Sequence, residues 1–463
     1  MRKEFGKQLD FSIAPGGRIH MIGIGGASMS GLALMLQQMG YHVTGSNNVD
    51  GAILDRLREK GIRVCIGHTA ENAAGADLVV YTTAVADNNP ELDACRRMRI
   101  PVLDRPTLLG YLSEQFRQCV AVCGTHGKTT TTAMLAEILV AANVDPTIHI
   151  GGQLDSIDGN IRMGQSDLFL TEACEYRRGC LHLHPTMGII LNIAEDHMDC
   201  YDTIQEIEDA FRQFMELLPS GGTAIGNGDD PRIVRRMEQL SCRTLSFGWD
   251  PKCDYQPAGY REDEQGYGRF DLVRGVVPLG TVSMSVPGRF NVYNALAALA
   301  AADALGLDMK QACEAISGFQ GARRRFELTS VTEGVEIFHD YGHNPEEIRN
   351  AISIARIRCR GKLWAVVQPH TFSRVRALFD DYLTCTEEAD VTLLTDIYAA
   401  REKDPGDLDS GMLAEGMRSR GIDARWTPAF ADVRRELYAS WQPGDLVITL
   451  GCGNINQLNE ELK

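Results

Sequence analysis

Hydrophobic positions along the chain alternate between two patterns. Short apolar runs, typical of buried strands, lead into glycine turns and then into stretches with apolar residues every three or four positions, typical of amphipathic helices. Residues 18–48 contain a strand, a turn, a helix and a second strand, and residues 76–85 and 100–105 add further strands. Strands that alternate with helices build parallel, doubly wound sheets, so we predict an α/β domain that closes near Arg105.

The same alternation restarts twice. Residues 118–144 again contain a strand, a turn and a helix, and residues 247–280 alternate over short runs typical of hairpins before an apolar helix at 291–307. A third α/β unit begins at about Gly321. Its predicted strands are residues 363–369, 391–398 and 445–451. We therefore predict an α/β fold with three domains, namely residues 1–105, 106–320 and 321–463.

Composition narrows the class of protein. The hydrophobic share of 44% and the charged share of 23% are those of a folded globular chain. A net charge of −16 argues against binding to nucleic acid. There is no signal-peptide pattern and no apolar run long enough to cross a membrane, so we expect a cytoplasmic protein. We expect it to be a monomer or a homodimer. The 13 cysteines include no C-x-x-C pair, and we expect reduced thiols.

The stretch GTHGKTT lies between a predicted strand and a predicted helix. Backbone N–H groups at such a junction converge on phosphate, and Lys128 adds a positive charge. Val122 stands where the strict phosphate-loop pattern has its first glycine, so the match rests on the strand–turn–helix context. The predicted phosphate-binding residues are Gly124, Thr125, His126, Gly127, Lys128, Thr129 and Thr130.

Acidic residues follow two later strands of the same predicted domain. Glu172 follows the apolar run 168–170, and a second strand ends in a polar group that includes His197. Such residues are often only solvated loop positions. Because the ends of parallel strands gather at one crevice, we expect a magnesium site there, facing the phosphate loop.

The N-terminal turn GIGGAS resembles part of a dinucleotide fingerprint, with Gly23 and Gly25 in place but Ser28 at the third position. The acidic residue that would hold an NAD ribose is missing, because that region reads Gly45, Ser46, Asn47. A dehydrogenase is thus a weaker alternative, and we expect the turn to bind the diphosphate of another nucleotide. In the last third of the chain, the segment QPHTFSRVR offers Arg374 and Arg376 for a carboxylate or phosphate.

These motifs together resemble the Mur ligase family. The likeness includes HMIGIGGASMSGLA, GTHGKTTTT, ILNIAEDHMDCY, PGRFNVYNALAA, RRRFE, DYGHNPEE, QPHTFSRVRALF and IYAAREK. It implies a Rossmann-like UDP-sugar domain, a central ATPase domain and a Rossmann-like C-terminal domain that closes over the site. HMDCY and QPH are typical of the branch that joins L-alanine to the carboxylate of UDP-N-acetylmuramate. That reaction uses ATP and an acyl phosphate, in peptidoglycan precursor synthesis.

The resemblance also implies roles for individual residues. The implied catalytic residues are Lys128, Glu172, His197, Arg325 and His343. ATP would contact the phosphate loop together with Asn294, Arg325 and Asp340. Two magnesium ions would be held by Thr129, Glu172 and His197. The UDP-sugar would contact Gly23, Gly25, Gly26, Ser28 and Ser46. The amino acid would contact Glu175, Tyr341, His343, Arg374 and Arg376.

The chain departs from the family pattern near the acceptor site. It reads EACEYR where the family commonly has EADESD, and Thr371 stands where arginine is common. These changes leave open a related ligase that loads another amino acid or a recycled murein tripeptide. A non-catalytic nucleotide-binding relative is the third hypothesis. The intact set Lys128, Thr129, Glu172 and His197 argues against it.

Overall fold

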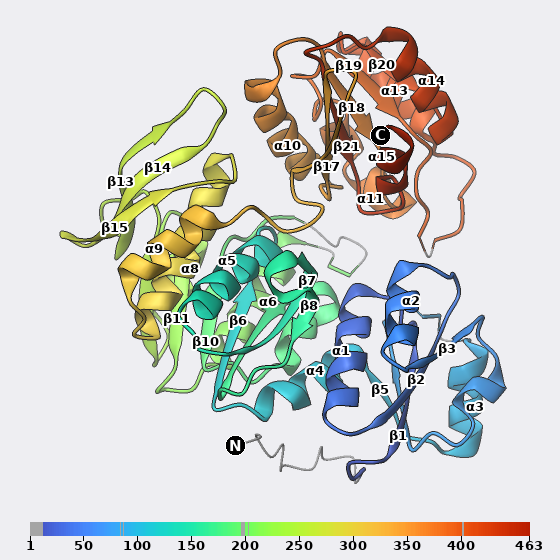
Figure 1. Ribbon diagram of the computed structural model, residues 1–463, viewed down its shortest axis with the longest axis vertical. Coiled ribbons are helices and arrows are strands. Elements are labelled where there is room, and N and C mark those ends of the chain that lie inside the picture. Colours follow the sequence, from blue (N-terminus) through green and yellow to red (C-terminus); the bar gives the residue numbers. More distant parts are fainter. Residues whose placement is uncertain (1–12, 84, 87, 196–199, 202, 401) are drawn as a thin grey trace.

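Three α/β lobes follow one another along the chain. The computed structural model describes residues 13–83, 85–86, 88–195, 200–201, 203–400 and 402–463. In Figure 1 the N-terminal lobe is blue, the central lobe runs from teal through green to yellow, and the C-terminal lobe, orange to red, lies above both. Each lobe contains its own sheet, and most strand pairs are parallel, which confirms the predicted α/β fold.

The N-terminal lobe has a five-stranded parallel sheet in the order β3-β2-β1-β4-β5. Its strands are β1 (Arg18–Ile22), β2 (His42–Asn47), β3 (Arg63–Ile66), β4 (Leu78–Tyr81) and β5 (Val102–Asp104), and its helices are α1 (Ala27–Gln38), α2 (Ala52–Glu59) and α3 (Pro90–Met98). The chain order reverses between β1 and β4, and open sheets bind ligands at such a switch point. The glycine turn that follows β1 lies at this position.

The central lobe has a ten-stranded sheet in the order β15-β14-β13-β12-β11-β10-β6-β9-β7-β8. Its strands are β6 (Gln118–Cys123), β7 (Thr147–Leu154), β8 (Gly159–Arg162), β9 (Leu168–Ala173), β10 (Met187–Ile190), β11 (Thr223–Asn227), β12 (Arg243–Phe247), β13 (Tyr255–Glu262), β14 (Gly268–Arg274) and β15 (Val277–Ser283). The predicted hairpins are confirmed as the antiparallel strands β13 to β15, which extend one edge of the sheet.

Helices cover this sheet. They are α4 (Arg105–Glu114), α5 (Lys128–Ala141), α6 (Ile204–Glu216), α7 (Pro231–Met237), α8 (Arg289–Ala304) and α9 (Met309–Gly318). The phosphate-loop helix α5 packs against α8, whose alanine-rich sequence is buried nearly all round. Small side chains let the two helices approach closely, and this brings Asn294 of α8 to the phosphate loop.

The C-terminal lobe has a six-stranded sheet in the order β16-β17-β21-β18-β19-β20, parallel except for the β16–β17 pair. Its strands are β16 (Glu327–Thr332), β17 (Val335–Asp340), β18 (Leu363–Val367), β19 (Val391–Leu394), β20 (Ala424–Trp426) and β21 (Leu446–Leu450). Its helices are α10 (Pro345–Arg358), α11 (Phe372–Ala377), α12 (Phe379–Tyr382), α13 (Ser410–Ser419), α14 (Phe430–Ser440) and α15 (Asn456–Glu461). The buried central strands explain the continuous apolar runs seen in the sequence.

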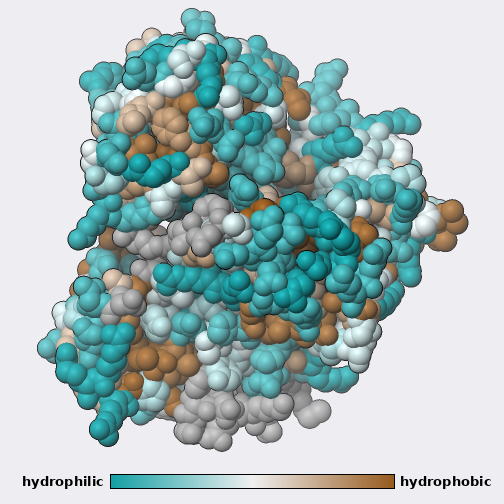
Figure 2. Space-filling model, turned by 180° about the vertical axis from the view of Figure 1, so that it is seen from behind, coloured by the Kyte–Doolittle hydropathy of each residue, from teal (hydrophilic) through white to brown (hydrophobic). Residues whose placement is uncertain are grey.

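The surface in Figure 2 is largely hydrophilic, with smaller apolar areas between the polar side chains. All 13 cysteines are free thiols, as predicted. Within the part of the chain that the structure describes, none of the helices combines the length and the apolar composition needed to cross a membrane.

Candidate active site

The phosphate loop joins β6 to α5 at the carboxyl edge of the central sheet. β6 ends at Cys123 and α5 begins at Lys128, so the loop is the four residues between them. Gly124 and Gly127 have φ of 143° and 85°, which L side chains rarely adopt. A Cβ at Gly124 would lie 2.9 Å from Leu191 Cβ, and one at Gly127 would collide with Asn294 Oδ1. Both glycines are therefore required by the backbone path and by close neighbours.

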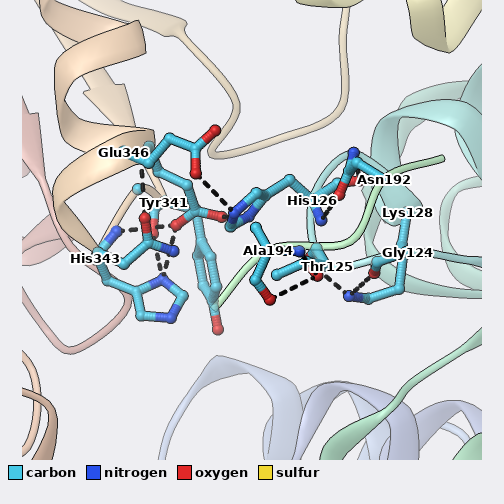
Figure 3. Close-up of polar contacts among 12 residues, drawn as sticks. Gly124, Thr125, His126, Lys128, Asn192, Ala194, Tyr341, His343 and Glu346 are labelled. Carbon is cyan, nitrogen blue, oxygen red and sulfur yellow. Dashed lines mark hydrogen bonds and ion pairs between the residues drawn. The ribbon is translucent and has the colours of Figure 1, made fainter. Parts of the chain in front are cut away.

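Lys128 folds back over the loop (Figure 3). Its Nζ donates to the carbonyl oxygens of Gly124 at 2.5 Å and Thr125 at 2.9 Å, and lies 2.9 Å from Glu175 Oε2. Burial disfavours the ammonium, but the Glu175 carboxylate outweighs it and raises the pKa of Lys128. Lys128 is thus charged at neutral pH and already lies at the phosphate loop.

A cavity of about 700 Å³ opens beside the loop, between the central and C-terminal lobes. His126, Gly127, Thr130 and Asn294, all predicted ATP contacts, line the central side. From the C-terminal side, Arg325 and Asp340 line the same cavity. The structure therefore brings these predicted residues together around one space.

Asp340 lies at the end of β17 with both carboxylate oxygens in use. Oδ1 accepts from the Gly342 N–H at 2.7 Å, and Oδ2 accepts from the Phe326 N–H at 2.8 Å. Burial raises the pKa of Asp340, while the charge of Arg325 opposes that rise. The carboxylate fixes the turn after β17 and the linker that carries Arg325.

A second cavity of about 1060 Å³ lies on the other side of the loop. The predicted residues that line it are Thr125, Lys128, Thr129, Glu172, Arg325, Tyr341, His343 and Arg374. It reaches the N-terminal lobe at Ala27 and Ser30 of α1. Arg325 lines both cavities, so the two spaces adjoin at its side chain.

Glu172 and Thr129 supply the oxygen atoms that a magnesium site needs. Glu172 Oε1 accepts from the Gly151 N–H at 2.6 Å, and a Cβ at Gly152 would lie 2.9 Å from Thr129 Cγ2. The two glycines thus bring β7 close to both candidate ligands. A carboxylate and a hydroxyl suit a hard cation. His197 lies outside the described residues, and among those described no group of three or more His, Cys, Asp and Glu forms a metal cluster.

His126 connects the phosphate loop to the C-terminal lobe. Its Nδ1 lies 3.2 Å from Glu347 Oε1, and its Nε2 lies 3.6 Å from Glu346 Oε2 (Figure 3). Burial disfavours the imidazolium, but the carboxylates of Glu346 and Glu347 outweigh it and raise the pKa of His126 to about 10. Glu347 Oε2 also lies 3.3 Å from His343 Nδ1. A charged contact therefore spans the two lobes beside the first cavity.

Aromatic rings and two guanidinium groups form the C-terminal wall of the second cavity. The rings of Tyr341, His343 and His370 lie in sequence with centroids 5.7 Å apart. Arg374 Nη1 lies 3.1 Å from His370 Nδ1, and the Arg325 guanidinium lies 5.0 Å from the Tyr341 ring centroid. This wall combines cations with ring faces, which suits an anionic acceptor.

The predicted UDP-sugar turn follows β1 at the switch point. Gly23 has φ of 77°, the Gly25 N–H donates to Asn47 Oδ1 at 3.3 Å, and Gly26 is the residue before α1. Ser28 Oγ lies 2.9 Å from His149 Nε2 in the central lobe. The turn thus presents a helix N-terminus at the carboxyl end of the sheet.

Some predicted contact residues line neither cavity, namely Gly23, Gly25, Gly26 and Ser28 of the UDP-sugar turn, Gly124 of the phosphate loop, and Ser46, Glu175 and Arg376. The last three have other partners. Ser46 is fully buried, and its hydroxyl donates to Glu91 Oε2 at 2.6 Å. Glu175 is buried against Lys128, where it orders the phosphate loop rather than facing the second cavity. Arg376 is 55% exposed and pairs with Asp407 at 2.6 Å.

Other residues line the cavities without having been predicted. Glu347 borders both cavities, and Cys452 and Arg56 border the second. Glu347 lies in the family motif DYGHNPEE, and Cys452 lies in the glycine-rich stretch GCGN (residues 451–454) after β21, so the sequence carried a signal for both. Arg56 lies on an ordinary charged helix, and its guanidinium pairs with Asp158 of the central lobe at 3.1 Å, a contact that the sequence does not signal.

A phosphate loop with a charged lysine, a carboxylate at the adjoining strand and two cavities that meet at an arginine define a nucleotide-dependent phosphoryl-transfer enzyme assembled from three lobes. Three family descriptions match successive parts of the chain. They are the Mur ligase family, catalytic domain (residues 18–117), the Mur ligase middle domain (122–302) and the Mur ligase, glutamate ligase domain (324–453).

Named relatives match nearly the full length. The UDP-N-acetylmuramate–L-alanine ligases of Clostridium botulinum strain Hall and Caldanaerobacter subterraneus are each 41% identical, with 96% of both chains covered. The crystal structure of the Thermotoga maritima ligase MurC has a TM-score of 0.83 at 27% identity, covering 96% of this chain and 98% of that one. A murein peptide ligase from Psychrobacter arcticus has a TM-score of 0.76 at 25% identity, with coverages of 96% and 98%. The chain belongs to the Mur ligase family.

Proposed function

We propose that this protein joins L-alanine to the lactyl carboxylate of UDP-N-acetylmuramate, with cleavage of ATP to ADP and phosphate. The observation that carries the proposal is the pair of adjoining cavities on either side of the phosphate loop, with Arg325 in the wall of both. One space suits ATP, the other suits the acceptor, and a phosphoryl group can pass between them. The 41% identity to alanine-adding ligases supports the choice of substrates.

The reaction begins with attack of the carboxylate oxygen on the γ-phosphorus of ATP, which forms an acyl phosphate and releases ADP. Lys128 and Arg325 neutralise the charge that develops on the transferred group. Thr129 and Glu172 would hold magnesium, and His197, outside the described residues, would hold a second ion. Bound magnesium would offset the repulsion between the two anions. Loop N–H groups after Gly124 align the phosphates.

The amine of L-alanine then attacks the acyl carbon, and phosphate leaves as the amide forms. His343 and Arg374 line the cavity where the amino acid would approach, and the ring of Tyr341 forms the wall beside them. Arg374 would pair with the alanine carboxylate, which leaves the amine facing the acyl group. We place this reaction in the cytoplasm, where ATP is made.

The site spans lobes that must come together during turnover. An acyl phosphate is destroyed by water, so the C-terminal lobe must cover it. The contact between His126 and Glu347 lies where the lobes meet beside the ATP cavity. It is the structural element through which closure of the C-terminal lobe would reach the phosphate loop.

The proposal is tested by ADP release from purified protein with Mg-ATP and UDP-N-acetylmuramate, in parallel reactions with L-alanine, glycine, L-serine, a murein tripeptide or no acceptor. We expect release that requires the UDP-sugar and is fastest with L-alanine. Preference for the tripeptide would move the protein to the recycling branch of the family. ATP binding without ADP release under any condition would support a non-catalytic relative.

A further inference from the structure

A chain of hydrogen bonds runs from the N-terminal lobe to the strand that carries Glu172. Arg105 Nη1 donates to Ser28 Oγ at 3.2 Å, and Ser28 Oγ lies 2.9 Å from His149 Nε2. The other ring nitrogen of His149, Nδ1, lies 3.1 Å from Thr171 Oγ1. Thr171 Oγ1 in turn donates to the backbone carbonyl of Glu172 at 3.3 Å. The His149 imidazole is the central member of this series of hydrogen bonds.

The donor and acceptor in each of these hydrogen bonds can be assigned by working inward from the two ends of the series. A guanidinium only donates, so Ser28 Oγ accepts from Arg105. The Thr171 hydroxyl proton goes to the Glu172 carbonyl, so Thr171 accepts from an Nδ1–H on His149. Nε2 is then the acceptor for the Ser28 hydroxyl. Burial, and secondarily the charge of Arg105, lower the pKa of His149 to about 4, which keeps the ring neutral as this assignment requires.

Arg105 lies where an anion would approach the glycine turn. It directly follows β5 and opens α4, while Ser28 lies in the first turn of α1. Both positions are at the carboxyl ends of the parallel strands, beside the topological switch point. Arg105 is half-buried, and among the residues that the structure describes no carboxylate pairs with it. A half-buried guanidinium beside a helix N-terminus suits a diphosphate.

We propose that His149 is a positioning residue for the UDP-sugar: it holds the Ser28 hydroxyl and thereby keeps the Arg105 guanidinium at the glycine turn, where Arg105 binds the diphosphate. The identity of the ligand rests on the proposed function. Ser28 then supports Arg105 and does not donate its own proton to the phosphates. Through Thr171 the same ring is linked to the backbone carbonyl of Glu172, whereas the Glu172 carboxylate is held by the Gly151 N–H.

The test uses two substitutions of His149, each of which keeps one of its two side-chain hydrogen bonds. His149→Gln places an amide near the former Nε2 and retains the Ser28 contact, whereas His149→Asn places one near Nδ1 and retains the Thr171 contact. The measurements are the Kd of UDP-N-acetylmuramate by calorimetry without ATP, and the KM values of both nucleotides. We expect His149→Asn to weaken UDP-sugar binding about tenfold, because the hydrogen bond to Ser28 is lost. His149→Gln keeps that hydrogen bond and should change binding less than about threefold. The KM of ATP should not change in either variant.

Controls separate positioning from a general structural role. Arg105→Gln should weaken UDP-sugar binding at least as much as His149→Asn. Equal binding by Asn and Gln variants, or a loss in both that follows a fall in Tm, would overturn the proposal. UDP, which carries the same diphosphate, is measured in parallel. Wild-type protein that binds UDP but not UDP-N-acetylmuramate would contradict the proposed function, and the UDP data would still decide the role of His149.

Discussion

The contact between His126 and the C-terminal lobe should make stability depend on pH in a defined window. The perturbation is His126→Gln, which removes the charge but keeps a polar side chain. His126 has its pKa raised from 6.5 to about 10 in the folded protein by Glu346 and Glu347. A raised pKa means that the folded state binds the proton more tightly. Its contribution to stability is therefore complete below pH 6.5, declines as pH rises, and is lost above about pH 10.

The size of the expected stability loss follows from the two carboxylates that His126 contacts, Glu346 and Glu347. A shift from 6.5 to about 10 sets an upper limit of about 5 kcal/mol. Glu346 is 59% exposed and its pair at 3.6 Å is screened by solvent, so it contributes below about 1 kcal/mol. Glu347 is only 18% exposed and lies at 3.2 Å, so we assign it about 2 kcal/mol. The expected loss on removing His126 is thus about 2–3 kcal/mol at pH 6.5.

The assay is the Tm of wild type and His126→Gln from pH 6 to 10.5 at fixed ionic strength. At about 1 kcal/mol per °C for a chain of this length, a difference of about 2–3 °C at pH 6.5 should shrink to near zero by pH 10. Glu346→Gln, which removes only the exposed partner, is the matched control and should show a much smaller difference. A wild-type-to-variant difference that stays constant across this range would refute the reasoning, because the raised pKa requires it to close.

Three further changes test the site. Lys128→Ala should abolish turnover, by at least about 100-fold, while UDP-N-acetylmuramate still binds in calorimetry, because the lysine serves phosphoryl transfer in the central lobe; loss of sugar binding as well would contradict this separation. Glu172→Gln should raise the magnesium concentration needed for half-maximal ADP release about tenfold or more, and an unchanged requirement would remove Glu172 from the metal site. Arg374→Ala should raise the KM of L-alanine about tenfold, whereas Arg376→Ala, which breaks only a surface pair with Asp407, should change it less than about twofold; equal effects would mean that both arginines reach the amino acid.

The phosphate loop could be predicted from the sequence because its signal is local. An apolar strand, two glycines and a helix that begins at Lys128 lie within a few positions of one another. The position of Glu172 near the phosphate loop could also be predicted, because parallel strands align their carboxyl ends at one edge of the sheet. The hairpins of the central lobe followed from short alternating runs, and they are confirmed as β13 to β15.

Contacts between distant parts of the chain could not be predicted in this way. His126 meets Glu347, 221 residues further on, and His149 meets Ser28 across 121 residues. Nothing in local periodicity distinguishes such partners from solvated charges. The same reason explains Arg376, which belongs to a motif but lies on the outer face of α11, paired with Asp407.

The central claim is that ATP activates the carboxylate of the sugar before the amine attacks. The most direct measurement uses UDP-N-acetylmuramate labelled with ¹⁸O in its lactyl carboxylate, with Mg-ATP and L-alanine, followed by mass spectrometry of the released phosphate. Transfer through an acyl phosphate moves one labelled oxygen from the carboxylate to each phosphate released, and this is the predicted result. Phosphate without label, formed while the amide product accumulates, would contradict the account.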